Sequence, residues 1–461
     1  MPTKTRQTRL EFGDFQTPPN LAATVVQHIY DQGFRPRSVL EPSCGKGAFL
    51  IAALKQFPQL ERAVGIDLNP KYLAELRKAA VGEERLKVRK ADCFSTNWKK
   101  LIASLPQPIL ILGNPPWVTS SRLGVLQSGN SPARRSSAVK NGLDAVTGKS
   151  NFDVSEWLLQ QWIEAMAGMD ARLVMLVKSS VARRVMLTLA DGGLGATTSP
   201  IDAAKHFGAT VTACILDVHP GGPKLATHNG LLISNRTLFE RRKNLAATEP
   251  SVSWRSGIKH DAAKVLELTP IGEGNYRNGL GAVVQLESTN LYPLLKSTDL
   301  AQAEVPQPSK VLIVPQVHTG APTAPIEQSA PLTWAYLQNH GNLLDARASS
   351  VYLRAPRFAI FGVGEYSFAP WKVATSCLHK NLQFHAIGPI GGKPVVFDDV
   401  SAFLGFSSQQ EAVQAANLLN SLPAREFLES LVFWDAKRPL TIELLRTLSL
   451  RKLQQSGEES T

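Results

Sequence analysis

The fold is decided by the stretch Ile109-Leu110-Ile111-Leu112-Gly113-Asn114-Pro115-Pro116-Trp117, an apolar run that ends at two prolines and a large ring. A short apolar run ahead of a turn signal is typical of a buried strand in a parallel sheet. The prolines fix φ twice and remove two backbone donors, so the chain leaves this strand in a stiff turn. Ligands of α/β sheets bind beyond the carboxyl ends of the strands, so the tetrad Asn114-Pro115-Pro116-Trp117 is predicted to border a site.

The tetrad offers an amide side chain, a proline carbonyl and a flat ring, which together can hold a planar amino group. Such an amine is a poor nucleophile, because its lone pair is delocalised into the ring that carries it. If the Asn114 side-chain oxygen and the Pro115 carbonyl each accept one N–H, the freed lone pair can be aimed at an electrophile. The alternative is that the prolines merely end a strand and Trp117 packs in a core.

Length and charge set the outer limits of the interpretation. With 461 residues the chain is long for one core, and two domains are predicted. A formal net charge of +12, from 50 basic and 38 acidic residues, favours a polyanionic partner, nucleic acid ahead of a membrane surface. No apolar stretch reaches transmembrane length and no signal peptide follows Met1, so we expect a cytoplasmic protein without a membrane partner. The four cysteines and nine histidines lack metal-ligand spacing, so no metal site is expected.

Upstream of the tetrad, the sequence alternates strand, turn and helix. Residues 38–50 are predicted to form a strand, then a glycine turn, then the start of an apolar helix that runs to Phe57. The spacing Gly45-x-Gly47, with Leu50 in place of a third glycine, disfavours nicotinamide or flavin binding. The next strand ends at Asp67, whose carboxylate can accept both ribose hydroxyls of an adenosine group, or can cap the following helix instead.

A third strand is predicted at residues 86–90, shortly before Asp92. This carboxylate can accept from an adenine amino group and Phe94 can cover the ring, although turn and core are the alternatives for both. At the N-terminus, Thr17-Pro18-Pro19 is typical of a helix entrance.

Residues 118–150 form a long segment rich in Ser, Gly and Asn. It carries Arg122, Arg134, Arg135, Lys140 and Lys149 against the single carboxylate Asp144. Long loops in compact domains are usually functional or disordered, and this composition suits contact with phosphates. The alternative is a solvated lid.

After this loop the alternation resumes, with helices near 154–169 and 181–189 and strands at 171–177, 210–218 and 230–234. It predicts a mostly parallel, doubly wound sheet with a terminal hairpin. Beyond about residue 240 the pattern becomes irregular, which indicates a second, α+β domain. Two stretches there, 352–358 and 366–372, interleave basic and aromatic residues. Arg354, Arg357 and Lys372 are therefore candidate DNA contacts, with aromatic core as the alternative.

In their order these motifs resemble the gamma class of S-adenosylmethionine-dependent adenine-N6 DNA methyltransferases of restriction–modification systems. Such enzymes place an aromatic/Thr-Pro-Pro segment first, then a glycine turn, a ribose carboxylate, an adenine-side aspartate, an Asn-Pro-Pro-aromatic tetrad and a target-recognition domain. Here these are Phe15 to Pro19, Glu41 to Gly47, Asp67, Asp92, the tetrad and the C-terminal half. The resemblance covers roughly residues 12–240. It departs from the pattern at Trp117, where Tyr or Phe is commoner, and at Cys93.

The resemblance implies a class I methyltransferase (Rossmann-like) sheet in residues 1–240, with the basic loop 118–150, and a target-recognition domain in residues 241–461. It implies S-adenosylmethionine as cofactor, held by Phe15, Thr17, Pro18, Glu41, Ser43, Gly45, Gly47, Asp67, Leu68, Asp92, Cys93 and Asn114. Asn114, Pro115, Pro116 and Trp117 would act on an adenine flipped out of double-stranded DNA, with Phe207 as a second aromatic beside the base. A cognate restriction endonuclease is the implied partner, in a bacterial or archaeal cytoplasm.

Other substrates and roles fit the same motifs. The tetrad can grip any planar NH₂ group, so an RNA adenine or a protein glutamine amide is an alternative, but the basic loop and the additional domain favour DNA. A non-catalytic DNA-binding subunit of the same fold is a further alternative, against which the intact tetrad argues. No cysteine follows a proline, so the nucleophile of cytosine-C5 methylation is absent.

Overall fold

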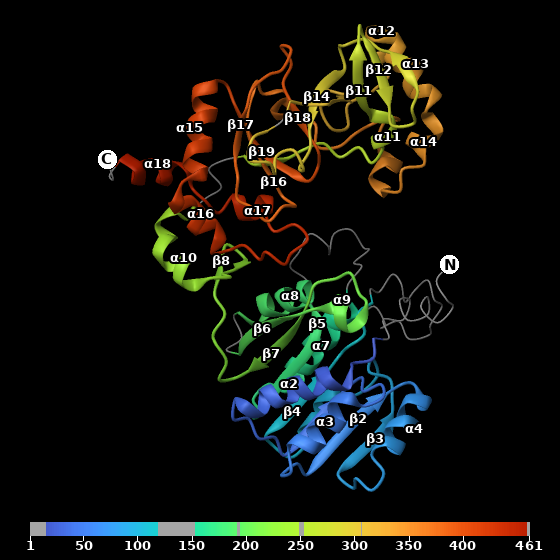
Figure 1. Cartoon of the computed structure of the whole chain (residues 1–461), viewed down its shortest axis with the longest axis vertical. Helices are drawn as coiled ribbons and strands as arrows, with labels where there is room; N and C mark the ends of the chain where they lie inside the picture. The colour runs from blue at the N-terminus through green and yellow to red at the C-terminus, as the bar shows by residue number, and fades with distance from the viewer. Residues whose placement is uncertain (1–14, 119–152, 191–193, 249–252, 306, 459–461) are drawn as a thin grey trace. The chain divides into compact units, whose positions relative to one another are not determined.

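The computed structural model describes residues 15–118, 153–190, 194–248, 253–305 and 307–458. Its internal contacts divide the chain into two compact units, Met1–Leu232 and Ile233–Thr461 (Figure 1). The boundary expected at residue 240 falls within helix α10 (Arg236–Arg242), which belongs to the second unit.

Among its described residues, the first unit contains a seven-stranded sheet of order β3-β2-β1-β4-β5-β7-β6. The strands are β1 (Ser38–Glu41), β2 (Arg62–Asp67), β3 (Leu86–Lys90), β4 (Ile109–Gly113), β5 (Ala171–Lys178), β6 (Gly195–Ile201) and β7 (Ala213–His219). β1 to β5 pair in parallel, whereas β7 runs antiparallel to both of its neighbours. This is the doubly wound, mostly parallel sheet that the alternating pattern predicts.

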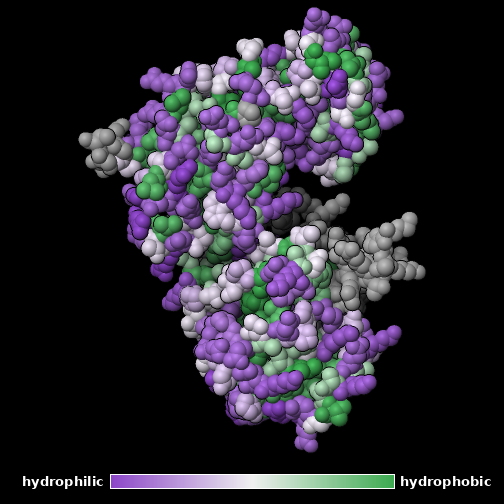
Figure 2. All heavy atoms as spheres, in the orientation of Figure 1, coloured by the Kyte–Doolittle hydropathy of each residue, from purple (hydrophilic) through white to green (hydrophobic). Residues whose placement is uncertain are grey.

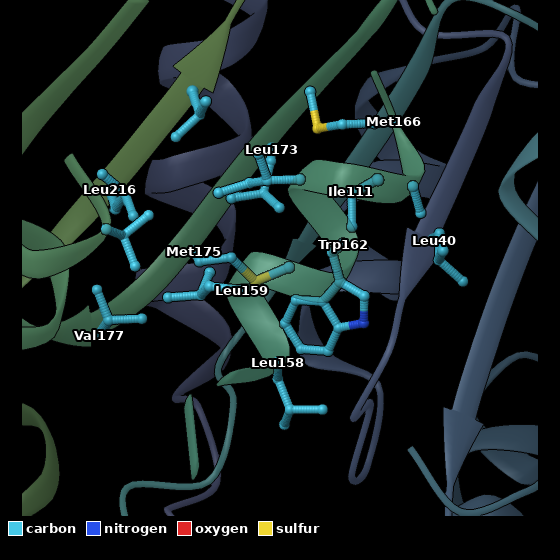
Figure 3. Close-up of a cluster of buried hydrophobic side chains, with 14 of the residues drawn as sticks. Leu40, Ile111, Leu158, Leu159, Trp162, Met166, Leu173, Met175, Val177 and Leu216 are labelled. Atoms are coloured by element: carbon cyan, nitrogen blue, oxygen red, sulfur yellow. The ribbon is translucent and has the colours of Figure 1, made fainter. Parts of the chain in front are cut away.

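Helices cover both faces of this sheet. They are α2 (Pro19–Asp31), α3 (Ala48–Gln56), α4 (Pro70–Ala79), α5 (Trp98–Ala103), α7 (Val154–Ala165), α8 (Ser179–Leu189) and α9 (Ala203–Phe207). Side chains of β4 alternate between two apolar clusters: Ile111 belongs to the cluster that includes residues of α5, α7 and α8, and Leu112 to the cluster that includes residues of α2, α3 and α4. Figure 3 shows the first cluster, in which Trp162 of α7 lies near Ile111 and Leu173. Burial on both faces explains why β4 is apolar at every position before its glycine.

The terminal hairpin lies elsewhere than the sequence indicates. β7 pairs with β6, a strand that the sequence pattern does not reveal, and residues 230–234 contribute only the two-residue β9 (Leu231–Leu232), paired with β8 (Thr227–His228). β6 reads Gly-Ala-Thr-Thr-Ser-Pro-Ile, is largely exposed and lies at the edge of the sheet. An edge strand tolerates proline and needs no apolar alternation, so this segment carries no strand signal.

The described part of the second unit mixes helices with two further sheets, as expected for an α+β domain. The sheets have the orders β10-β19-β16-β17 and β13-β12-β11-β15-β14-β18. Their strands are β10 (Arg255–Ser256), β11 (Glu267–Gly272), β12 (Asn275–Asn278), β13 (Val283–Gln285), β14 (Leu291–Leu295), β15 (Lys310–Ile313), β16 (Trp371–Ser376), β17 (His385–Ile387), β18 (Val396–Phe397) and β19 (Ser401–Phe406).

The helices of this unit, besides α10, are α11 (Ala263–Leu266), α12 (Ile326–Ser329), α13 (Pro331–Asn339), α14 (Gly341–Asp345), α15 (Gln409–Asn420), α16 (Leu422–Glu429), α17 (Ile442–Leu445) and α18 (Leu450–Glu458). Hydrophilic residues cover much of the visible face of each unit, with hydrophobic residues scattered between them (Figure 2). No described helix combines the length and the apolar composition that a membrane crossing requires.

Candidate functional site

A cavity of about 1300 Å³ opens in the first unit, where β1 to β4 end. Most of the residues expected to hold a cofactor line it: Phe15, Thr17, Pro18, Glu41, Ser43, Gly45, Asp67, Leu68, Asp92, Cys93 and Asn114. Pro116 lines it as well, whereas Gly47, Pro115 and Trp117 do not. The fold therefore brings together, at one edge of the sheet, segments that are separated by up to a hundred positions in the sequence.

Two glycines shape the turn after β1. Gly45 and Gly47 have φ values of +49° and +77°, which residues other than glycine rarely adopt. A Cβ at Gly47 would lie 2.3 Å from Leu76 of α4, so Gly47 allows close packing of the turn. Gly47 has a structural role outside the cavity, while Gly45 borders it.

Asp67 is fixed by the backbone and still faces the cavity. Its two carboxylate oxygens accept from the N–H of Gly45 at 2.8 Å and from that of Asn69 at 2.7 Å. The cap of α4 is Asn69, which accepts from the N–H of Lys71, so Asp67 is not the helix cap. Each carboxylate oxygen has a second lone pair, which leaves Asp67 able to accept from ligand hydroxyls.

Glu41 is a buried acid in the wall of the cavity. It is 3% exposed, and one of its oxygens accepts from the N–H of Leu50 at 3.3 Å. Burial raises the pKa of Glu41 well above its ordinary value, and the nearby negative charge of Asp67 raises it further. A cation in the cavity would favour the ionised form of Glu41.

Asp92 and its neighbours form the wall that follows β3. Asp92 accepts from the N–H of Phe94 at 2.9 Å, and the Phe94 ring packs 5.7 Å from Trp157 while lining the cavity. Burial raises the pKa of Cys93 to about 12, so its thiol stays neutral. An acceptor beside an aromatic ring suits a flat heterocycle that carries an amino group.

Asn114 holds the feature with the clearest chemical meaning. Its Nδ2 donates to the carbonyl of Phe15 at 2.8 Å and to Thr17 Oγ1 at 3.4 Å. Its Oδ1 is buried and has no hydrogen-bond partner among the described residues. A buried acceptor without a partner is costly and rare in native proteins, so it points to a donor from beyond the described residues.

Trp117 is not presented beyond the sheet as the sequence suggests. It is 6% exposed, and its Nε1 donates to the carbonyl of Leu176 at 3.3 Å. Its ring centroid lies 5.4 Å from that of Phe15 and 5.5 Å from that of Phe207, and these two lie 6.1 Å apart. The indole packs here because the two rings lie against it, one tilted and one edge-to-face, and the Leu176 carbonyl accepts from its N–H. The fold nevertheless places Phe207 beside Trp117, the pair that the resemblance implies.

The candidate DNA contacts differ in their exposure. Arg122, Arg134, Arg135 and Lys140 lie outside the described residues. Arg354 is exposed, and Arg357 is exposed and pairs with Asp345 at 3.0 Å.

Lys372, in contrast, is 1% exposed and donates to the carbonyls of Ala369 and Val395, so the expectation that it contacts DNA is wrong for this structure. It lies on β16, whose following four residues are buried as well, and its basic-aromatic pattern reflects the core of the second unit.

One residue of the site carries no recognisable sequence signal. Gln16 accepts from the N–H of Lys46 at 3.1 Å, and a Cβ at Gly45 would lie 2.5 Å from the Gln16 amide. The hydrogen bond from Lys46 to Gln16 thus connects the N-terminal segment to the glycine turn. Only its place between Phe15 and Thr17 could have suggested this role. Within the described residues, no group of three or more His, Cys, Asp or Glu side chains is placed to hold a metal ion.

Comparisons with known proteins agree with this architecture. No family model matches the chain. The fold is similar to the solved structure of the type IIL restriction-modification enzyme MmeI in complex with DNA, with a TM-score of 0.54 and 12% identity over 96% of this chain. The chain spans 65% of that enzyme, just under two thirds of its length. This likeness confirms the Rossmann-like methyltransferase fold with a further domain.

The sequence is 39% identical to the type II methyltransferase M.NspV of Nostoc sp., over 97% of this chain and 98% of that protein. At that identity over nearly the full length of both proteins, the chain belongs to the type II methyltransferase family.

Proposed function

We propose that the protein transfers a methyl group from S-adenosylmethionine to the N6 atom of an adenine flipped out of double-stranded DNA, as the modification enzyme of a restriction–modification system. The observation that carries this proposal is the buried acceptor Asn114 Oδ1, which lacks a partner among the described residues and belongs to a residue that lines the same cavity as Asp67 and Asp92. An acceptor in that place suits a substrate amino group.

The residues of the cavity fit the proposed cofactor. Asp67 would accept from the ribose hydroxyls and Asp92 from the adenine amino group, while the ionised form of Glu41 would face the positive charge of the ligand. When bound, S-adenosylmethionine supplies an electrophilic methyl group on a sulfonium centre. The substrate amino group would donate to the Asn114 oxygen, which has no partner among the described residues. The positive charge of the cofactor would stabilise the ionised form of the buried Glu41.

Asn114 would activate the target amine by geometry. Its Oδ1 accepts one N–H, and the Pro115 carbonyl accepts the other. With both hydrogens held out of the plane of the base, the nitrogen lone pair leaves conjugation and points at the methyl group. When the methyl group passes to the nitrogen, the electron pair of the broken S–C bond would stay on the sulfur of the donor, and the nitrogen would lose one proton to solvent to restore the neutral amine. No residue of the chain has to form a covalent intermediate in this scheme.

Trp117 and Phe207 would receive the flipped base. Extrusion of a base costs a few kcal/mol, and stacking on an aromatic side chain contributes ~1–3 kcal/mol. The Phe15 ring packs against both aromatics in this structure. A base can therefore stack on Trp117 only after the Phe15 ring moves aside.

Several features support DNA as the substrate. The chain carries a net charge of +12, its relative M.NspV is a type II methyltransferase, and MmeI, of similar fold, was solved in complex with DNA. We assign phosphate contacts to Arg122, Arg134, Arg135 and Lys140, and to Arg354 and Arg357 of the second unit, which we propose as the target-recognition domain. A cognate restriction endonuclease would share the recognition sequence.

Mapping of modified bases tests the proposal. DNA from cells that express the protein should contain N6-methyladenine at one short sequence, and DNA from cells that express Asn114→Ala should contain none. Calorimetry on the purified variant should show S-adenosylmethionine binding unchanged, because Asn114 acts on the substrate. Methylation of cytosine, RNA or protein by the wild-type chain in place of DNA adenine would refute the assignment.

A further inference from the structure

The Asn114 side chain is held in one orientation by the segment that precedes α2. Its Nδ2 lies 2.8 Å from the carbonyl oxygen of Phe15, which stands 99 positions earlier in the chain, and 3.4 Å from Thr17 Oγ1. A backbone carbonyl can only accept, so the amide edge that faces it must be the NH₂ group. A flipped amide would bring two oxygen acceptors together at this distance.

The orientation decides what Asn114 offers to a substrate. The two edges of a primary amide are almost equal in size, so shape alone does not choose between them. With Nδ2 engaged by Phe15 and Thr17, the edge left without a partner in the described structure is Oδ1. In the reverse orientation the same position would hold a donor, which would repel an amine and attract a base carbonyl.

We propose that Phe15 and Thr17 are positioning residues, which lock the Asn114 amide so that it presents oxygen and thereby select an amino group as the methyl acceptor. This inference rests on the proposed function. It excludes bases that carry a carbonyl at the reacting position, guanine O6 and thymine O4, because oxygen would then face oxygen. The choice of an amino group over a carbonyl thus depends on two groups outside the tetrad, the Phe15 carbonyl and the Thr17 hydroxyl.

Asn114→Asp tests the lock, because it keeps the shape and replaces NH₂ by oxygen. In its neutral form the introduced carboxyl donates to the Phe15 carbonyl and its second oxygen still accepts from the substrate. In its ionised form an anionic oxygen faces that carbonyl oxygen at hydrogen-bond distance, and the repulsion between them pushes the side chain out of its place beside the substrate. A hydrogen bond from the neutral form raises the pKa of the introduced carboxyl above the ordinary value of about 3.9.

Methyl transfer by Asn114→Asp should therefore be fastest at acid pH and fall by about tenfold per pH unit above the raised pKa, a decline that wild type does not share. The assay follows radiolabelled methyl groups from S-adenosylmethionine into unmodified plasmid DNA. Calorimetry of cofactor binding at each pH separates a loss of binding from a loss of turnover. A variant as active as wild type at pH 8 would overturn the lock.

Thr17 supplies a second test with a matched control. Thr17→Val removes the hydroxyl acceptor and keeps the shape, so kcat should fall about two- to tenfold, and by a larger factor than any loss of cofactor affinity measured by calorimetry. Thr17→Ser keeps the hydroxyl and should restore kcat. If Thr17→Val weakens cofactor binding and leaves kcat intact, Thr17 is a cofactor contact and the lock is wrong.

The two proposals fail in different ways. A wild-type protein that does not methylate DNA adenine refutes the proposed function. The pKa of the introduced carboxyl can still be measured without substrate, by NMR of Asn114→Asp protein labelled with carbon-13 aspartate and compared with wild type. A raised pKa supports the lock, and an ordinary one refutes it.

Discussion

Asp67 and Asn114 line the same cavity, but they differ in what they leave available. Both carboxylate oxygens of Asp67 are fixed by backbone N–H groups and retain lone pairs, whereas Asn114 keeps one buried oxygen without a partner in the described residues. Asp67 is therefore suited to bind a cofactor, and Asn114 is suited to bind the reacting group of a substrate. In our proposal, Asp67 therefore acts in cofactor binding and Asn114 acts in turnover.

The role of Asp67 can be tested by substitution. Asp67→Ala should weaken S-adenosylmethionine binding by about tenfold or more, since hydrogen bonds to a charged group contribute ~1.5–3 kcal/mol each. Asp67→Asn, which keeps one acceptor, should lose less. Calorimetry measures both affinities, and equal cofactor binding by wild type and Asp67→Ala would exclude the role.

Glu41 should make cofactor binding depend on pH. Burial and the charge of Asp67 raise the pKa of Glu41, and a bound cation would lower it, so binding of the cation should release a proton. Affinity should then rise with pH, by up to about tenfold per unit, between the lowered and the raised pKa. Calorimetry in buffers of different ionisation enthalpy counts the protons. Glu41→Gln should bind without this release, and the same release in the variant would assign it to another group.

At the scale of single elements, β16 and β6 are two strands whose local sequence does not predict their burial or their secondary structure. β16 places Lys372 in the core of the second unit, where its Nζ donates to two backbone carbonyls and burial lowers the pKa of the side chain to about 7. β6 is polar because it is an edge strand. In both strands the position in the sheet, which is set by neighbours distant in sequence, overrides the local pattern.

Burial of Lys372 should appear in the stability of the protein. In the unfolded chain this lysine keeps its proton up to about pH 10.4, whereas in the folded protein it loses the proton near pH 7. The unfolded state therefore binds more protons between these values, and the contribution of Lys372 to stability rises with pH across that window, by at most about 1.4 kcal/mol per unit. Free energies of unfolding for wild type and Lys372→Met, measured at pH 7 and pH 9, should diverge in favour of wild type. A constant difference would show that Lys372 titrates normally.

At the scale of the whole molecule, net charge and domain organisation bear on the substrate. The first unit holds the cavity that we assign to a small cofactor and one amino group, and the second adds more than two hundred residues that this proposed chemistry does not require. A large additional domain in a chain of charge +12 fits a long polyanion better than a small metabolite.

DNA association should accordingly weaken steeply with salt. Each phosphate neutralised by a Lys or Arg side chain contributes about −0.9 to the slope of log K against log salt concentration. Arg354→Ala should reduce the magnitude of this slope by about 1, because an exposed arginine on a phosphate contributes one such contact. Fluorescence anisotropy of labelled duplex DNA measures the slope, and a response independent of salt would contradict the assigned phosphate contacts.

The sequence by itself determined β1 to β5, the glycine turn, the carboxylates Asp67 and Asp92 and the strand that delivers Asn114. These features follow from apolar runs, turn residues and short spacings, which act within a few positions of one another. Only the tertiary structure decided the pairing of β6 with β7, the burial of Trp117 and Lys372, and the bond from Asn114 to the Phe15 carbonyl. These depend on contacts between segments distant in sequence, so no local pattern records which edge of an amide faces the cavity or which ring covers another.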